Sequence, residues 1–235
     1  MSRALVVIAA FGSAAAAAAA ATAGASAAAG AAPPDDGLVL VDRPIDFSAE
    51  RVALTRAYLH DHYGIDAAGI EIVPKMIVVH WTGGPSLEAA FRTFAPPRLG
   101  KGRSLLADAS PLNVSAHFLV ARDGTAYRLM PETWMARHAV GLNYDALGVE
   151  NVGGPASPLT AAQLDADEKL VRRLAARFPT IRWLIGHDES RRFEGTPLFR
   201  ERDARYRTRK VDPGPKFMAA LRARVADLAL KSVPD

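Results

Sequence analysis

The order of apolar and polar residues from residue 48 onward predicts an alternation of helices and strands. Helical spacing or capping residues predict helices at residues 48–63, 86–94, 160–178 and 215–225. Short apolar or β-branched runs predict strands at residues 76–80, 114–121, 125–130, 146–152 and 181–185. This order of elements predicts one α/β domain with a central mixed β-sheet flanked by helices.

Capping and turn residues support several of these elements. Ser48 is a good N-cap for the first helix, and Gly64 a good stop for it. Thr160 and Gln163 form a capping box at the start of the third helix. Asp-Gly at residues 123–124 is a strong signal for a hairpin between two strands. Residues 96–113, with their prolines and basic residues, are expected to form a loop.

The N-terminal part has a different composition, dominated by alanine. A short basic start at Arg3, an apolar stretch over residues 4–11 and small residues before residue 33 are typical of an export signal. A transmembrane anchor is the alternative, but the strongly apolar part is shorter than the ~18 residues that a span requires. We therefore expect a signal peptide at residues 1–32, a linker or N-terminal extension at residues 33–47 and the folded domain at residues 48–235.

Composition and charge narrow the class of protein. The chain has 235 residues, 49% of them hydrophobic, and no cysteine, which excludes a disordered chain and a disulfide-rich miniprotein. Without cysteine there is no lipidated N-terminal residue, so after signal cleavage we expect no membrane anchor and a periplasmic or secreted protein. The net charge of +4 is compatible with an anionic polymer as partner. The export signal argues against nucleic acid.

Two of the six histidines lie where strands end. His80 closes the strand at residues 76–80, and His187 follows the strand at residues 181–185. Asp212 lies just before the last helix, and Pro213 and Pro215, which follow it, make the backbone there rigid. Two imidazoles and one carboxylate are a normal ligand set for a catalytic zinc ion, with a fourth position for water. Residue types alone leave two interpretations open: a metal site, or two partly buried histidines that are hydrogen-bonded.

Six short motifs in chain order resemble those of a known family, the zinc-dependent N-acetylmuramoyl-L-alanine amidases of type 2, which includes AmpD-like enzymes and peptidoglycan recognition proteins. The similarity covers residues 76–225. The motifs are IVVHWT at residues 77–82, VSAHFLV with RDGTAY at 114–127, ARHAVG at 136–141, LGVE at 147–150, IGHD at 185–188 and KVDPGP at 210–215.

The resemblance implies a role for each of five residues. His80, His187 and Asp212 would bind one Zn²⁺ ion. Glu150 would take a proton from water and pass it to the leaving amine. Lys210 would place positive charge beside the oxyanion. The bond cleaved would be the amide between N-acetylmuramic acid and L-alanine, in peptidoglycan or in soluble muropeptides.

The resemblance also implies substrate contacts. His138 matches a histidine of the family's cleft and would contact the substrate or the transition state. Arg137 stands where the family has a tryptophan, so stacking would need another residue such as Trp134. Trp81 and Asn143 are candidates for the lining of the groove, although packing alone would explain both.

The remaining histidines and one charged segment have other expected roles. His117 lies within a strand and is expected to be a buried packing residue rather than a ligand. His60 and His62 lie outside the matched motifs and are not expected to bind metal. Residues 188–210 are rich in both charges. Their arginines either pair with carboxylates of the stem peptide or pair with acidic residues of the segment itself.

Two other functions compete with the amidase. A module of the same fold could bind muropeptide without cutting it, and such proteins typically lack a metal ligand. A hydrolase of the same fold could act on another amide. All three ligand positions and both catalytic positions carry competent residues here, which favours the enzyme.

Overall fold

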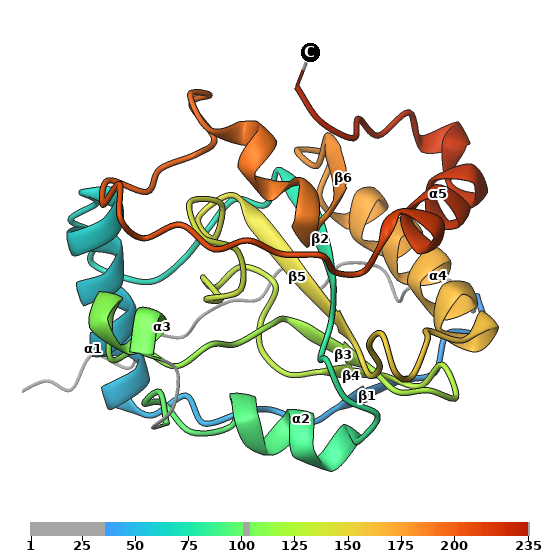
Figure 1. The fold of residues 1–235 in the computed structure, drawn as a ribbon, viewed down its shortest axis with the longest axis horizontal. Coiled ribbons are helices and arrows are strands. Elements are labelled where there is room, and N and C mark those ends of the chain that lie inside the picture. The colour runs from blue at the N-terminus through green and yellow to red at the C-terminus, as the bar shows by residue number, and fades with distance from the viewer. Residues whose placement is uncertain (1–35, 101–103, 235) are drawn as a thin grey trace, which may run out of the picture. The chain divides into compact units, whose positions relative to one another are not determined.

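The computed structural model describes residues 36–100 and 104–234. The expected signal peptide, residues 1–32, lies outside the described residues. A mixed six-stranded sheet with the order β1-β4-β3-β5-β2-β6 forms the centre of the domain (Figure 1). Neighbouring strands are parallel except in the β3–β4 hairpin. The strands are β1 (Leu40–Asp42), β2 (Met76–Trp81), β3 (Phe118–Val120), β4 (Ala126–Arg128), β5 (Ala146–Asn151) and β6 (Trp183–Gly186).

Helices lie around this sheet, and the expected α/β architecture is confirmed. In Figure 1, α4 and α5 lie together beside β6, whereas α1 and α3 lie together on the other side of the view. Within residues 36–100 and 104–234, no helix is long and apolar enough to cross a bilayer. The helices are α1 (Ala49–Tyr58), η1 (Leu59–Tyr63), α2 (Leu87–Phe94), α3 (Ser104–Ala109), α4 (Ala161–Arg177), η2 (His187–Phe193), α5 (Pro215–Arg224) and η3 (Ala226–Leu228).

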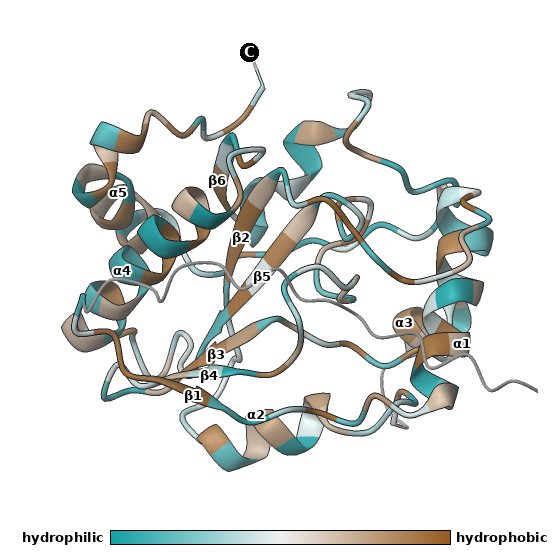
Figure 2. Ribbon diagram, turned by 180° about the vertical axis from the view of Figure 1, so that it is seen from behind, coloured by the Kyte–Doolittle hydropathy of each residue, from teal (hydrophilic) through white to brown (hydrophobic). Residues whose placement is uncertain are grey.

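Alternation along β2 gives each face of the sheet its own core. Ile77 and Val79 pack in one cluster with residues of α4 and α5, whereas Met76 and Val78 pack in a second cluster with Ile185. All five side chains are fully buried, each stabilising the fold by about 1.5–3 kcal/mol. β2 and β5 are accordingly among the most hydrophobic parts of the ribbon in Figure 2.

The same alternation along β2 decides on which face of the sheet the polar side chains lie. His80 follows Met76 and Val78 at steps of two, so it lies on the face opposite α4 and α5. It is paired in register with Glu150 of the parallel strand β5. A slip of one residue in this pairing would carry a histidine or a carboxylate to the helix-covered face. Burial of the aliphatic residues therefore fixes the positions of both polar groups.

Several local signals give the expected structure. The Ser86 side chain caps α2 by accepting a hydrogen bond from the Ala89 amide (3.2 Å), and Thr160 and Gln163 form the expected capping box. Gly64 ends the first helical segment in the left-handed conformation, with φ of 63°. Gly124 has φ of 89° in the β3–β4 hairpin, where a side chain would strain the turn.

The structure corrects the expected boundaries in three places. β1 pairs with β4 inside the segment expected as a linker, residues 33–47. α3 lies inside residues 96–113, which were expected to be a loop. The two hairpin strands are shorter than expected, because Ser115 exchanges hydrogen bonds with Arg137 rather than with a neighbouring strand. In each case, pairing with distant residues decides the outcome, and local sequence patterns carry no record of it.

Candidate active site

Three side chains expected to bind metal come together on the face of the sheet opposite α4 and α5. His80 lies near the end of β2, His187 follows β6 directly, and Asp212 lies in the segment before α5. His80 Nδ1 and His187 Nδ1 are 2.8 Å apart. Asp212 Oδ2 lies 3.3 Å from the first nitrogen and 3.2 Å from the second. All three residues are buried, so their donor atoms share one small space.

Hydrogen bonding defines which nitrogen of His80 carries the proton. His138 Nε2 lies 3.3 Å from the carbonyl oxygen of Ala146, which can only accept, so His138 carries its proton on Nε2. His138 Nδ1 must then accept from His80 Nε2, 3.0 Å away. His80 is therefore protonated on Nε2, and its Nδ1 lone pair is directed at His187 and Asp212. This tautomer is the one that a metal ligand requires.

A glycine makes room for this arrangement. A Cβ atom at Gly148 would lie 2.8 Å from Cγ of His138, closer than real contacts allow. Gly148 also donates its amide hydrogen to His117 Nδ1 (3.0 Å), while His117 Nε2 donates to the Trp134 carbonyl oxygen (2.8 Å). His117 is fully buried and supports the strand beneath His138. This position agrees with the expected packing role.

The charges within the cluster are fixed by burial and by mutual contact. Burial lowers the pKa of His187 to about 4, and the neighbouring His80 adds to the effect. Burial raises the pKa of Asp212, but the polar contacts with His187 and His80 outweigh it and hold this pKa well below its usual range. The cluster therefore presents a neutral His187 imidazole and an ionised carboxylate at neutral pH. Both protonation states are those in which these groups bind a metal.

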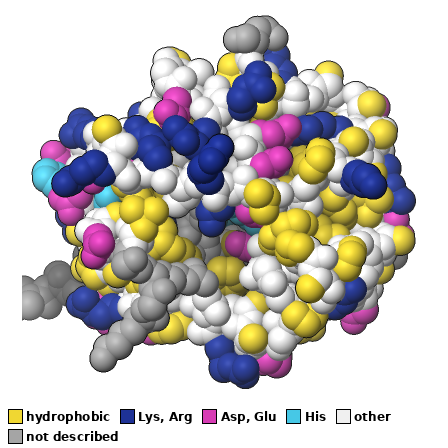
Figure 3. All heavy atoms as spheres, viewed as in Figure 1, with side chains coloured by type: hydrophobic (Ala, Val, Ile, Leu, Met, Phe, Trp, Pro, Cys, Tyr) yellow, Lys and Arg dark blue, Asp and Glu magenta, His cyan; other side chains and the backbone are white. Residues whose placement is uncertain are grey.

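A cavity of about 290 Å³ opens over the cluster and is seen as the central hollow in Figure 3. Glu150 and Lys210 line it, together with His138, His187 and Asp212. Glu150 is half-buried, whereas Lys210 is exposed. These five residues, whose side chains can bind metal, transfer protons or carry charge, therefore lie at one opening. Basic side chains gather along one rim of the hollow, and hydrophobic side chains lie on another side of it (Figure 3).

Two further expected groove residues also line the cavity, Trp81 and Asn143. Asn143 is only 1% exposed. Its Oδ1 accepts hydrogen bonds from the amides of His138 (2.8 Å) and Ala139 (2.7 Å), and its amide group donates to the Tyr63 hydroxyl (2.9 Å). The structure thus gives Asn143 the task of holding the backbone at His138. Direct contact of Asn143 or Trp81 with substrate stays a prediction.

Arg137 has a role that the sequence did not indicate. It is 2% exposed, although it lies within the cleft motif at residues 136–141. Its guanidinium donates hydrogen bonds to three carbonyl oxygens in and after α3 and to one tyrosine hydroxyl, those of Leu106, Ser110, Leu112 and Tyr206. Arg137 therefore ties α3 to the segment that leads to Lys210. Trp134 was the candidate to replace the stacking tryptophan that the family has at the position of Arg137. It packs edge-on against Phe47 instead.

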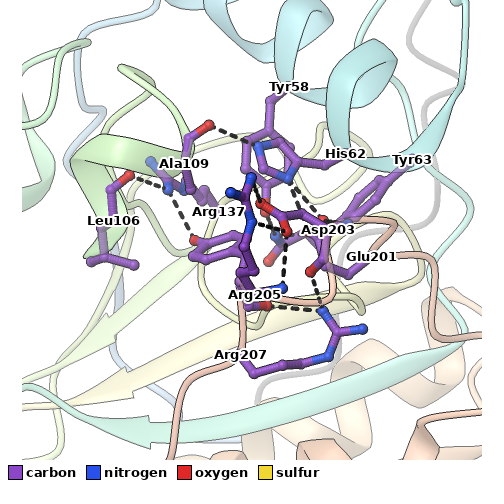
Figure 4. A network of polar contacts seen from close by, with 12 residues as sticks. Tyr58, His62, Tyr63, Leu106, Ala109, Arg137, Glu201, Asp203, Arg205 and Arg207 are labelled. Carbon is purple, nitrogen blue, oxygen red and sulfur yellow. Dashed lines mark hydrogen bonds and ion pairs between the residues drawn. The ribbon is translucent and has the colours of Figure 1, made fainter. Parts of the chain in front are cut away.

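A buried ion pair strengthens the same wall (Figure 4). His62 Nε2 donates to the Ala109 carbonyl oxygen (3.0 Å), and His62 Nδ1 lies 2.9 Å from Glu201 Oε1. Both ring nitrogens face acceptor oxygens, an arrangement that favours the doubly protonated imidazole. Burial lowers the pKa of His62, but the hydrogen bond and charge of Glu201 outweigh it, and the pKa is raised. His60 instead forms an exposed pair with Asp66, so neither histidine is near the candidate metal ligands.

The charged segment at residues 188–210 is largely paired with its own surroundings. Arg191 lies 2.7 Å from Glu194, and Arg205 lies 3.2 Å from Asp203. Arg200 reaches the buried Asp145 of the neighbouring loop at 2.9 Å. The contacts of Arg191 and Arg205 match the self-paired alternative, whereas Arg200 pairs with a residue outside the segment. Pairing of other arginines with substrate carboxylates stays a prediction.

Comparison with known proteins identifies the family to which the chain belongs. The family model for N-acetylmuramoyl-L-alanine amidase (Amidase_2) matches residues 69–215, more than half of the chain. The chain belongs to this family. Over 160 residues it is 30% identical to the 1,6-anhydro-N-acetylmuramyl-L-alanine amidase AmpD of Salmonella typhimurium, covering 61% of this chain and 76% of the relative. The expected resemblance is thereby confirmed.

Solved amidase structures share the fold of this family member. The N-acetylmuramoyl-L-alanine amidase LysC from Clostridium intestinale superposes with a TM-score of 0.51 at 20% identity, covering 82% of this chain and 98% of LysC. The endolysin amidase LysCS from the same organism has a TM-score of 0.50 at 18% identity, covering 82% and 96%. At such identities the likeness concerns the fold alone.

Proposed function

We propose that this protein is a zinc-dependent N-acetylmuramoyl-L-alanine amidase that hydrolyses the amide between N-acetylmuramic acid and L-alanine. The observation that carries the proposal is the convergence of His80 Nδ1, His187 Nδ1 and Asp212 Oδ2 within 2.8–3.3 Å of one another, in a cavity that Glu150 also lines. Membership of the amidase family supports the choice of reaction.

The three donors fit a zinc ion. Zinc takes imidazole nitrogen and carboxylate oxygen at about 2.0–2.2 Å in a tetrahedral arrangement, which places donor atoms roughly 3.3 Å apart. The observed separations of 2.8, 3.2 and 3.3 Å are close to this value. The lone pair on His80 Nδ1, set by His138, gives the required ligand atom. A zinc ion held there would supply Lewis acidity, which polarises the scissile carbonyl and makes a water molecule more acidic.

Two residues of the chain would handle the proton and the developing charge. The Glu150 carboxylate, held by β5 in register with His80, accepts a proton from the attacking water and delivers it to the leaving amine of L-alanine. Lys210, which also lines the cavity, stabilises the negative charge on the carbonyl oxygen in the transition state. The products are a glycan with a free lactyl carboxylate and a free stem peptide.

The N-terminal sequence supports export as part of the same proposal. A protein that meets the cell wall outside the cytoplasm needs a signal such as the one expected at residues 1–32. Expression of the full chain, followed by cell fractionation and intact-mass measurement, tests this. We expect a shortened protein in the periplasm or medium. Full-length protein confined to the cytoplasm would refute export while leaving the chemistry untouched.

The decisive test of the reaction is metal-dependent release of stem peptide. Purified protein is incubated with peptidoglycan, after treatment with chelator and after return of Zn²⁺, and free stem peptide is measured by mass spectrometry. We expect release only with zinc, and a loss of at least about 10²-fold in Glu150→Gln with zinc content unchanged. Glu71→Gln, at an exposed carboxylate, is the matched control. Zinc-loaded protein that binds peptidoglycan but releases nothing would instead be a recognition module.

A further inference from the structure

A second hollow lies directly beside the candidate active site and shares Trp81 with it. This groove has a volume of about 520 Å³ and runs between residues 154–159 and residues 213–217. Pro213, on its wall, follows the candidate ligand Asp212 in the chain. The groove therefore adjoins the cavity over the candidate metal ligands at their shared residue, Trp81.

The chemistry of the groove differs from that of the cavity. Its walls carry two aromatic side chains, four prolines and Leu159, and the aromatic residues are Trp81 and Phe217. Among the described residues that line it, Lys216 is the one charged side chain. The cavity, in contrast, is lined by Glu150, Lys210 and the histidine cluster. One ligand that fills both hollows must have a polar part and a part with apolar faces and little charge.

One wall of the groove is held rigidly in place. Arg122 donates hydrogen bonds to the carbonyl oxygens of Ser157 (3.3 Å) and Pro158 (3.2 Å). Gly154 and Ser157 exchange backbone hydrogen bonds of 2.9 and 3.0 Å. A Cβ atom at Gly154 would lie 2.9 Å from the backbone of Gly83, so glycine allows this loop to approach the loop after β2. A preformed wall reduces the entropy lost when a ligand binds.

The opposite wall is tied to a candidate metal ligand. The Asp188 amide donates to the Asp212 carbonyl oxygen (3.0 Å), which holds the chain beside His187. Gly214, with φ of 92°, then turns the chain into α5, where Lys216 and Phe217 form the first turn. The groove and the ligand cluster therefore keep a constant relative position.

We propose that this groove binds the glycan strand of the substrate, at sugar residues beyond the muramic acid whose amide is cleaved. The inference rests on the proposed function, which places the muramoyl carbonyl at the ligand cluster. A pyranose ring has apolar C–H faces that stack on aromatic and proline rings, while its hydroxyl groups point outward to solvent. N-acetylglucosamine carries no charge and suits this groove, whereas the carboxylates of a stem peptide suit the side of Lys210. The groove selects substrates with an extended glycan over a single muramoyl peptide.

Glycan length is the variable that tests the groove. Initial rates are compared for a muramoyl peptide and for a tetrasaccharide of alternating N-acetylglucosamine and N-acetylmuramic acid that carries the same peptide. We expect a KM at least threefold lower for the tetrasaccharide. Leu159→Ala and Phe217→Ala should each reduce this ratio toward one. Val73→Ala, at an exposed apolar residue outside the groove, is the matched control and should keep it.

A binding measurement separates this inference from the proposed reaction. Calorimetry with the peptide-free tetrasaccharide requires no hydrolysis, and we expect weaker binding by Leu159→Ala than by Val73→Ala. Equal KM values for the two substrates, or no binding of the peptide-free glycan, would overturn the glycan groove even if the amide is cleaved. Glycan binding without hydrolysis would support the groove while refuting the amidase. Leu159→Ala keeps the test valid if Phe217→Ala fails to fold.

Discussion

Asp167 makes the stability of this protein depend on pH in an unusual direction. It lies in α4, is 1% exposed, and accepts one hydrogen bond from the Asn151 amide group (2.8 Å). Its Oδ1 atom has no partner among the described residues. Burial raises the pKa of Asp167 from 3.8 to about 7, although the Asn151 hydrogen bond lowers it in part. The folded protein therefore holds this proton far more tightly than the unfolded chain.

The sign and size of the effect follow from this difference in pKa. Between pH 3.8 and pH 7 the folded state binds more protons than the unfolded state, so the free energy of unfolding falls as pH rises through this window. A difference of roughly 3 units, at about 1.4 kcal/mol per unit, corresponds to about 4 kcal/mol in total. The loss is complete above pH 7. Asp167→Asn keeps the shape of the protonated acid and cannot ionise, so it should escape this loss.

Urea unfolding of the two proteins at pH 5 and pH 8 checks the reasoning. We expect Asp167→Asn to gain about 2–3 kcal/mol relative to the natural protein between these two pH values. Asp165→Asn is a matched control on the same helix, because its partner Arg224 is at the surface and such pairs contribute little. If the free energy of unfolding of Asp167→Asn differs from that of the natural protein by the same amount at both pH values, the account is refuted.

Three further predictions concern the site and its walls. His138→Ala removes the acceptor for His80 Nε2, and we expect zinc affinity to fall by about 10- to 100-fold in chelator competition. Gly148→Ala forces a Cβ atom against the His138 ring; about 1–3 kcal/mol of stability should be lost in thermal melts, with weaker zinc binding. Arg137→Ala leaves buried carbonyl oxygens without a donor, and urea unfolding should show a loss of about 2–4 kcal/mol. An unchanged value in any of these measurements would contradict the corresponding contact.

The parts of the fold that depend on local signals could be predicted from the sequence. The capping box at Thr160 and the hairpin at Gly124 each act within a few residues, and both appear as expected, whereas Ser48, the expected N-cap of the first helix, makes no capping hydrogen bond through its side chain. β1 is different, because its strand exists only through pairing with Ala126 and its neighbours in β4. A three-residue edge strand has too little pattern to be found from sequence alone.

In the candidate site, too, some residues could be predicted from the sequence and others could not. His80, His187 and Asp212 were identified through family motifs, since no short spacing joins them, and the structure brings them together. The support behind them could not be predicted. Arg137 stood out as a departure from a motif, but its role depends on carbonyl oxygens in and after α3, and no pattern in the sequence predicts that contact. A buried arginine of this kind has no signature in a single sequence.

The parallel pairing of β2 with β5 has a consequence for how such an enzyme can be altered. His80 and Glu150 are held opposite each other by the hydrogen-bond ladder of the sheet, and no loop is needed to keep them there. The loop at residues 154–159 borders the neighbouring groove but does not set that pairing. Exchange of this loop between relatives should therefore change which substrates are accepted while the reacting groups stay in place. For protein engineering, the sheet and the segment that carries Lys210 and Asp212 are the parts to preserve, and this loop is the part to vary.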